Sequence, residues 1–155
     1  MKKGLLFVLI ILSSFMLVGC GEKKTDRLQI LEELVDNDII PKKFKEVDQE
    51  FYKQYIGEWC ESRLTYIYKD GDGDLFGIQF KKGFGQNKYY VSVYKTVTEN
   101  DFVDYYDEDE IPEKCNEQAY YDTEDDKPSK TPKYSLEGFE SYTFTKDDDE
   151  YKLDK

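Results

Sequence analysis

Apolar residues recur at spacings of three and four between residues 26 and 37, which is the period of an amphipathic helix. The repeating positions are Leu28, Leu31, Leu34 and Val35. Thr25 or Asp26 stands where a side chain can cap the first turn. We therefore expect a helix over residues 26–37 that packs one face against a domain.

Residues 41–56 show a similar spacing. Their apolar stripe consists of Phe44, Val47, Phe51 and Tyr55. Pro41 is suited to the first turn of a helix, where its missing N–H is not needed, and Gly57 is placed to end one. The pattern predicts a second helix that pairs with the first.

After Trp59 the period of apolar residues changes to two, which indicates half-buried strands. Two alternating runs flank the sequence DGDGD at residues 70–74, which predicts a hairpin with a tight turn. A third strand is expected over residues 88–97, with tyrosines on both of its faces. The alternating positions are Leu64, Tyr66, Tyr68, Phe76, Ile78 and Phe80, and then Tyr89, Val91 and Val93 against Tyr90, Ser92 and Tyr94.

Residues 98–133 have the least regular pattern, with three prolines, many acids and one short strand candidate at residues 118–121. We expect a long loop there. Tyr142 and Phe144 then pair with Tyr151 and Leu153 in a closing hairpin. Together the patterns predict an α+β fold, in which two amino-terminal helices pack on a five- to six-stranded antiparallel sheet.

The amino end combines Lys2 and Lys3, an apolar run from Leu5, and the sequence Leu17-Val18-Gly19-Cys20. This segment resembles the signal peptide and lipobox of bacterial lipoproteins. The resemblance implies that residues 1–19 are a signal peptide and that Cys20 carries a diacylglyceryl thioether. Residues 20–24 would then be a short lipidated tether, and residues 25–155 a single small acidic domain.

The expected location is therefore the extracytoplasmic face of the cell membrane, because two acyl chains anchor a protein stably. An uncleaved signal anchor and a freely secreted product are the alternatives. The apolar run is shorter than the roughly 20 residues of a comfortable membrane-spanning helix.

The chain contains 22 basic and 34 acidic residues and has a net charge of −12. Loss of residues 1–19 would leave 20 basic residues against 34 acidic ones, a net charge of −14. Such a charge excludes nucleic acid as a partner and favours basic proteins, cationic peptides or metal ions. The oligomeric state is left open by these observations.

The chain has no histidine. This removes Ser-His-Asp and Cys-His nucleophilic sites and histidine-ligated zinc. Paired carboxylates remain available for catalysis, but no pair stands out among so many acids. We therefore expect a protein that is not an enzyme and that uses no cofactor.

With Cys20 lipidated, Cys60 and Cys115 form an even pair outside the cytoplasm, where disulfides persist. A bridge between them would stabilise the fold by roughly 4 kcal/mol. The alternative is two buried free thiols.

Asp70, Asp72 and Asp74 place three carboxylates on alternate residues of the glycine-bearing turn. Oxygen clusters of this kind suit calcium, and the spacing begins like an EF-hand loop. It then departs from that pattern, because Leu75 and Lys81 stand where the loop needs a glycine and a bidentate glutamate. The alternatives are a plain hairpin turn and a low-affinity calcium site.

Tyr90 and Tyr94 of the third strand, with Phe84 in a glycine-flanked turn, are candidates for an aromatic recognition surface. The alternative is that the tyrosines pack in the core. The acidic runs 107–110 and 147–150 are either solvated or serve to dock a basic partner. The leading hypothesis is a non-catalytic, membrane-tethered module that binds a basic or envelope-associated protein.

The sequence Gly57-Glu58-Trp59 arrives just before the first expected strand and is similar to the entry motif of lipocalins. That similarity implies an up-and-down β-barrel with a cavity for a small apolar ligand. A lipocalin-like binder of such a ligand is therefore the alternative function.

Overall fold

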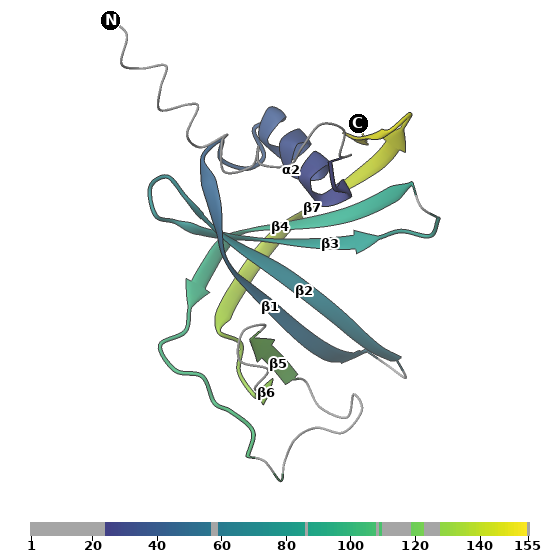
Figure 1. Cartoon of the computed structure of the whole chain (residues 1–155). Helices are drawn as coiled ribbons and strands as arrows, with labels where there is room; N and C mark the ends of the chain where they lie inside the picture. Colours follow the sequence, from purple (N-terminus) through teal and green to yellow (C-terminus); the bar gives the residue numbers. More distant parts are fainter. Residues whose placement is uncertain are drawn as a thin grey trace, which may run out of the picture.

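The part of the chain that the structure describes forms one short helix and an eight-stranded antiparallel sheet (Figure 1). The computed structural model describes residues 24–56, 59–85, 87–107, 109, 119–122 and 128–154, and only the backbone of residues 54–56, 59, 60 and 122. The prediction of two amino-terminal helices on a five- to six-stranded sheet is therefore wrong. The lipocalin-like barrel is wrong as well, because the sheet is not closed.

Strands β1 to β4 form an antiparallel meander, in which each strand pairs with the next. Strand β5 then lies beside β1, and β7 lies beside β4, so the two flanks of the sheet come from the second half of the chain. The sheet order is β6-β5-β1-β2-β3-β4-β7-β8, and its end strands have only two and four residues. The elements are α2 (Asp26–Asp36), β1 (Phe44–Ile56), β2 (Trp59–Asp70), β3 (Leu75–Lys82), β4 (Lys88–Glu99), β5 (Ala119–Asp122), β6 (Pro128–Ser129), β7 (Tyr134–Asp147) and β8 (Glu150–Leu153).

Helix α2 confirms the first predicted helix and its cap. The Thr25 hydroxyl accepts a hydrogen bond from the Leu28 N–H at 3.3 Å, which satisfies one donor of the first turn. The apolar stripe of the helix is buried on one face of the sheet, which we call the helix face. The core there consists of Ile30, Leu31, Leu34, Ile40, Tyr68, Phe76, Ile78, Val91, Val93, Phe144 and Tyr151.

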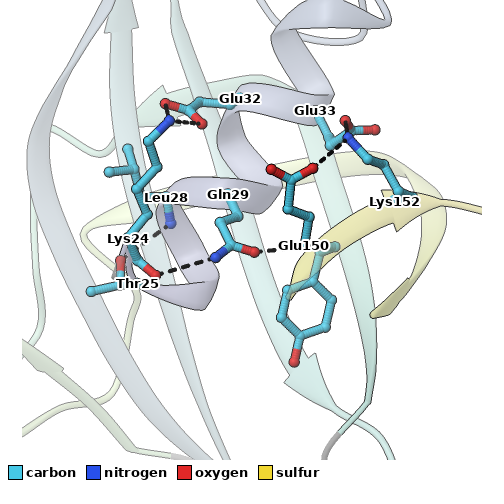
Figure 2. Close-up of polar contacts among 9 residues, drawn as sticks. Lys24, Thr25, Leu28, Gln29, Glu32, Glu33, Glu150 and Lys152 are labelled. Atoms are coloured by element: carbon cyan, nitrogen blue, oxygen red, sulfur yellow. Dashed lines mark hydrogen bonds and ion pairs between the residues drawn. The ribbon is translucent and has the colours of Figure 1, made fainter. Parts of the chain in front are cut away.

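Polar contacts fix the helix to the far end of the chain (Figure 2). Gln29 accepts a hydrogen bond from the Tyr151 N–H at 3.2 Å, and Glu33 pairs with Lys152 at 2.9 Å. These contacts hold α2 against β8, the last strand of the sheet.

The segment predicted as a second helix is strand β1, and a β-bulge explains the error. The register with β2 pairs Glu46 with Tyr68 and Asp48 with Ile67, so Val47 is the extra residue. A bulge reverses the parity of a strand, because one residue is inserted into its alternation. Phe44 before the bulge and Phe51 after it therefore share a face, although their spacing is odd.

A second buried region lies on the opposite side of the sheet, which we call the reverse face. Thr65 and Ile67 of β2 are fully buried there. A side chain at Gly77 would meet Leu136 of β7 at 3.4 Å and Val97 at 3.5 Å. The absence of a side chain at this glycine lets the two halves of the curved sheet approach each other.

Candidate functional site

Strand β4 separates its tyrosines between the two faces of the sheet, as its alternation predicts. The register pairs Tyr90 with Lys81 and Tyr94 with Gly77, which places both tyrosines on the reverse face. Tyr90 is 47% exposed, whereas Tyr94 is only 9% exposed. Phe84, in the turn between β3 and β4, is fully exposed. Tyr90 and Phe84 thus lie on the surface, and Tyr94 belongs to the core.

Phe139 of β7 lies beside Tyr94 on the reverse face and is exposed. The two residues are paired across β4 and β7, their ring centroids are 5.4 Å apart, and Phe139 is 59% exposed. The Tyr94 hydroxyl donates a hydrogen bond to Gln79 at 3.4 Å, and burial raises the pKa of this tyrosine. Tyr94 is therefore a fixed support for an exposed phenylalanine that the sequence analysis missed.

The ring of Tyr90 lies against the turn that carries Phe84. A Cβ atom at Gly83 would be 3.2 Å from Cε2 of Tyr90, so glycine leaves the space that this ring needs. Tyr90 pairs with Thr143, four residues from Phe139 on β7, which is about 13 Å along the strand. We call Phe84, Tyr90 and Phe139 the aromatic surface.

The polar side chains beneath this surface are already paired. The Gln79 amide donates to the Tyr52 hydroxyl and to the Thr65 hydroxyl, each at 2.9 Å. Beside them, Glu61 accepts hydrogen bonds from Lys81 and Arg63, both at 2.7 Å. These bonds lower the pKa of Glu61 to about 2. The surface therefore rests on fixed groups, which reduces the ordering cost of binding.

A second polar cluster, also missed from the sequence, joins β1 to the start of β7. Asp48 accepts hydrogen bonds from the Lys133 ammonium at 2.5 Å and from the Tyr134 hydroxyl at 2.9 Å, and Glu50 accepts one from the Lys133 N–H at 2.7 Å. The residues at i and i+2 of a strand share a face, so a correct strand assignment would have brought Asp48 and Glu50 together.

The two carboxylates of this cluster have opposite pKa shifts. Glu50 is 5% exposed, and desolvation raises its pKa to about 7. Desolvation also acts on Asp48, but the bonds from Lys133 and Tyr134 outweigh it and hold the pKa of Asp48 below its ordinary value. Both groups are engaged with the backbone or with β7, so the cluster clamps β7 to β1.

The three aspartates of the candidate calcium site form a hairpin turn. One carboxylate oxygen of Asp70 accepts hydrogen bonds from the N–H groups of Asp72, Gly73 and Asp74, each at 2.9 Å. Gly73 has a φ of +99°, which favours glycine. The described residues hold no group of three or more Cys, Asp or Glu side chains placed to bind a metal.

An open depression of about 580 Å³ lies between the end of α2 and the turn after β2. Its apolar floor includes Ile40, Phe76 and Val93. Two lysines on its rim are already in ion pairs, Lys42 with Asp38 at 3.7 Å and Lys95 with Glu140 at 3.0 Å. The small-ligand hypothesis depended on a closed barrel, so it loses its structural basis.

The remaining sequence predictions fall largely outside the described residues. Cys20, Cys115 and the pair Gly57-Glu58 lie there, and so do Glu108 and Glu110 of the first acidic run. The backbone of Cys60 pairs with Tyr55 in the β1–β2 hairpin. The lipid anchor and the disulfide stay predictions.

The second acidic run forms the turn between β7 and β8, where Asp147 pairs with Glu150. Asp148 and Asp149 lie at its exposed tip, and Asp148 has a φ of +53°. Among the helices that the structure describes, none has the length and apolar character needed to cross a membrane. Comparisons with protein-family models, with curated proteins and with solved structures find no match to this chain.

Proposed function

We propose that this chain is a membrane-anchored extracytoplasmic lipoprotein that acts as a non-catalytic module for binding a basic or envelope-associated protein. One observation carries the proposal: a strongly acidic chain exposes three large aromatic side chains on or beside one face of its sheet. Phe84, Tyr90 and Phe139 are each at least 47% exposed.

Aromatic side chains supply much of the binding energy at protein interfaces, because they bury a large area with few rotatable bonds. Phe139 is supported by Tyr94, and Tyr90 is held close to Gly83. Such pre-ordered rings lose little conformational freedom when a partner covers them. The aromatic surface therefore supports a role in recognition.

The charge of the chain supports a basic partner. The net charge of −12 attracts cationic surfaces over a Debye length of about 8 Å at physiological salt. The acidic turn 147–150 adds local negative charge at the edge of the sheet that carries Phe139. Rim charges of this kind raise the rate of association and select against acidic partners.

The lipobox-like segment supports the location. A diacylglyceryl group at Cys20 would hold the domain close to the membrane through a tether of five residues. A labelled fatty acid supplied to the producing cell should be incorporated into the protein, and replacing Cys20 by Ser should abolish this label. An unlabelled native protein, or equal labelling of the Cys20→Ser variant, would contradict the lipid anchor.

The binding role is tested by site-specific photocrosslinking in the producing cell. A photoreactive phenylalanine analogue replaces Tyr90 or Phe139, and a matched control places it at Asp36, which is exposed on α2 over the opposite face. We expect one basic or envelope-associated protein to be captured from both aromatic positions and not from Asp36. Equal capture from all three positions, or none from the aromatic positions, would refute the proposal.

A further inference from the structure

Within the described part of the chain, no strand covers most of the outer edge of β7. β8 pairs only with the last four residues of β7, Phe144 to Asp147, whereas β4 pairs with the inner edge from Tyr134 to Thr145. Over the ranges that the structure describes, no strand pairs with the outer edge of residues 135–142. Residues 137–141 are all exposed. Such an edge presents backbone groups that can template a further strand.

The direction of the backbone groups along this edge follows from one hydrogen bond. The Asp154 N–H donates to the Thr143 carbonyl at 2.8 Å, so Thr143 directs its peptide groups away from β4. Peptide groups alternate in direction along an antiparallel strand, so Ser141 and Phe139 also direct theirs outward. Their N–H and C=O groups lie beside the exposed ring of Phe139.

We infer that the outer edge of β7 binds an extended segment of a basic protein as an added β-strand. The inference rests on the proposed function and assigns it a mode of recognition, in which main-chain hydrogen bonds provide affinity and side chains provide selectivity. Phe139 supplies an apolar cross-strand contact, and the exposed Glu137 favours a lysine or arginine opposite it.

Charge selects this occupant over a second copy of the chain. Pairing two β7 edges would bring Glu137 and Glu140 of both copies into one interface, within a pair of chains that each carry a charge of −12. Like charges directly opposite each other destabilise a sheet, whereas opposite charges stabilise it. A basic segment therefore fits this edge.

The test uses the lipidated chain in neutral detergent micelles and a short synthetic peptide that alternates lysine with valine. Amide hydrogen exchange is followed residue by residue with and without the peptide. We expect new protection at the amides of Phe139 and Ser141, and little change at Tyr142, whose amide already faces β4. Peptide binding without protection at Phe139 and Ser141 would overturn the inference.

A proline variant tests the same edge by affinity. Ser141→Pro removes one outward donor, and proline is tolerated on the free side of an edge strand. The matched control Ser141→Ala removes the hydroxyl and keeps the N–H. We expect affinity for the peptide to fall about tenfold in the proline variant and to stay unchanged in the alanine variant.

The outcomes separate this inference from the proposed function. Equal affinity of a folded Ser141→Pro variant, or no peptide binding at all, would refute strand addition. Crosslinking from Tyr90 and Phe139 would still decide whether the aromatic surface binds a partner. If the proline variant does not fold, the exchange pattern of the unsubstituted chain decides the question by itself.

Discussion

Tyr94 lies beside Phe139 on the neighbouring strand, with 5.4 Å between the ring centroids and a tilt of 48° between the ring planes. Only the phenylalanine is exposed to a substantial extent. The pair divides the reverse face into a supporting layer and a binding layer. Substitutions in the two layers should therefore have different consequences for stability and for binding.

Replacement of Tyr94 should destabilise the fold. Tyr94→Ala leaves a cavity beside Phe139 and removes a hydrogen bond to Gln79, so we expect a loss of about 3 kcal/mol in the free energy of unfolding. Tyr94→Phe keeps the ring and should cost only about 1 kcal/mol. Urea unfolding measures both values. A stable Tyr94→Ala protein would show that this ring is not part of the core.

Gly77 should not tolerate a large side chain. A Cβ atom there would lie 3.3 Å from the side chain of Thr65 and 3.4 Å from that of Leu136, so the bulkier valine must push these side chains aside. Overpacking of this kind costs about 1–3 kcal/mol. Thermal unfolding of Gly77→Val, compared with Gly77→Ala, measures the cost. Equal melting temperatures would contradict the close approach of the two halves of the sheet.

Glu50 should make the protein less stable as the pH rises. Its pKa is about 7 in the folded protein and near its ordinary value of 4.5 in the unfolded chain, so the folded protein binds the proton more tightly. This contribution is fully present below about pH 4.5 and is lost as the pH rises to about 7, with a total of about 3 kcal/mol.

The control for this prediction is Glu50→Gln, which keeps an acceptor for the Lys133 N–H and does not titrate. We expect the free energy of unfolding of the unsubstituted protein to fall relative to this variant between pH 4.5 and pH 7. The contribution of Asp48 to stability changes with pH in the opposite direction, because a lowered pKa gives stability that is lost on acidification. Parallel profiles for the two proteins would refute the burial of an ionisable Glu50.

The Asp70 side chain should contribute more to the stability of the fold than the other side chains of the turn. Asp70→Ala removes the acceptor of three N–H groups and should lower the free energy of unfolding by about 1–2 kcal/mol. Asp70→Asn keeps an acceptor oxygen, and Asp72→Ala removes none of these hydrogen bonds, so both should cost less. Thermal unfolding with and without calcium measures the stability of each variant and any stabilisation by the metal. A melting temperature that rises with calcium, and no longer does so in Asp72→Ala, would establish a metal site instead.

Local patterns predicted the parts of the fold whose alternation is unbroken. The capped helix, the strands around the DGDGD turn and the two faces of β4 follow from spacing alone, because no bulge interrupts their periodicity. Strand β1 was misassigned, because the bulge at Val47 converts its alternation into a helix-like spacing.

The candidate site was predicted only in part, because some of its residues come together through pairing between strands that are distant in sequence. Tyr90 and Phe84 could be identified as surface aromatics, but sequence alone could not assign Tyr94 to the core. Phe139 follows Gly138, whose φ of +56° interrupts the strand pattern, so its position beside Tyr94 depends on pairing between distant strands. The pairing of Asp48 with Lys133 likewise depends on contacts between β1 and the start of β7.

The central claim is that the aromatic surface binds a partner and does not serve the core. The most direct measurement is a binding titration with the partner that crosslinking identifies. It compares the unsubstituted protein with the double variant Tyr90→Ala/Phe139→Ala, and urea unfolding of the same preparations measures their stability. We predict that affinity falls about a hundredfold while the free energy of unfolding changes by less than about 1 kcal/mol. Unchanged affinity in a fully folded double variant would contradict the claim.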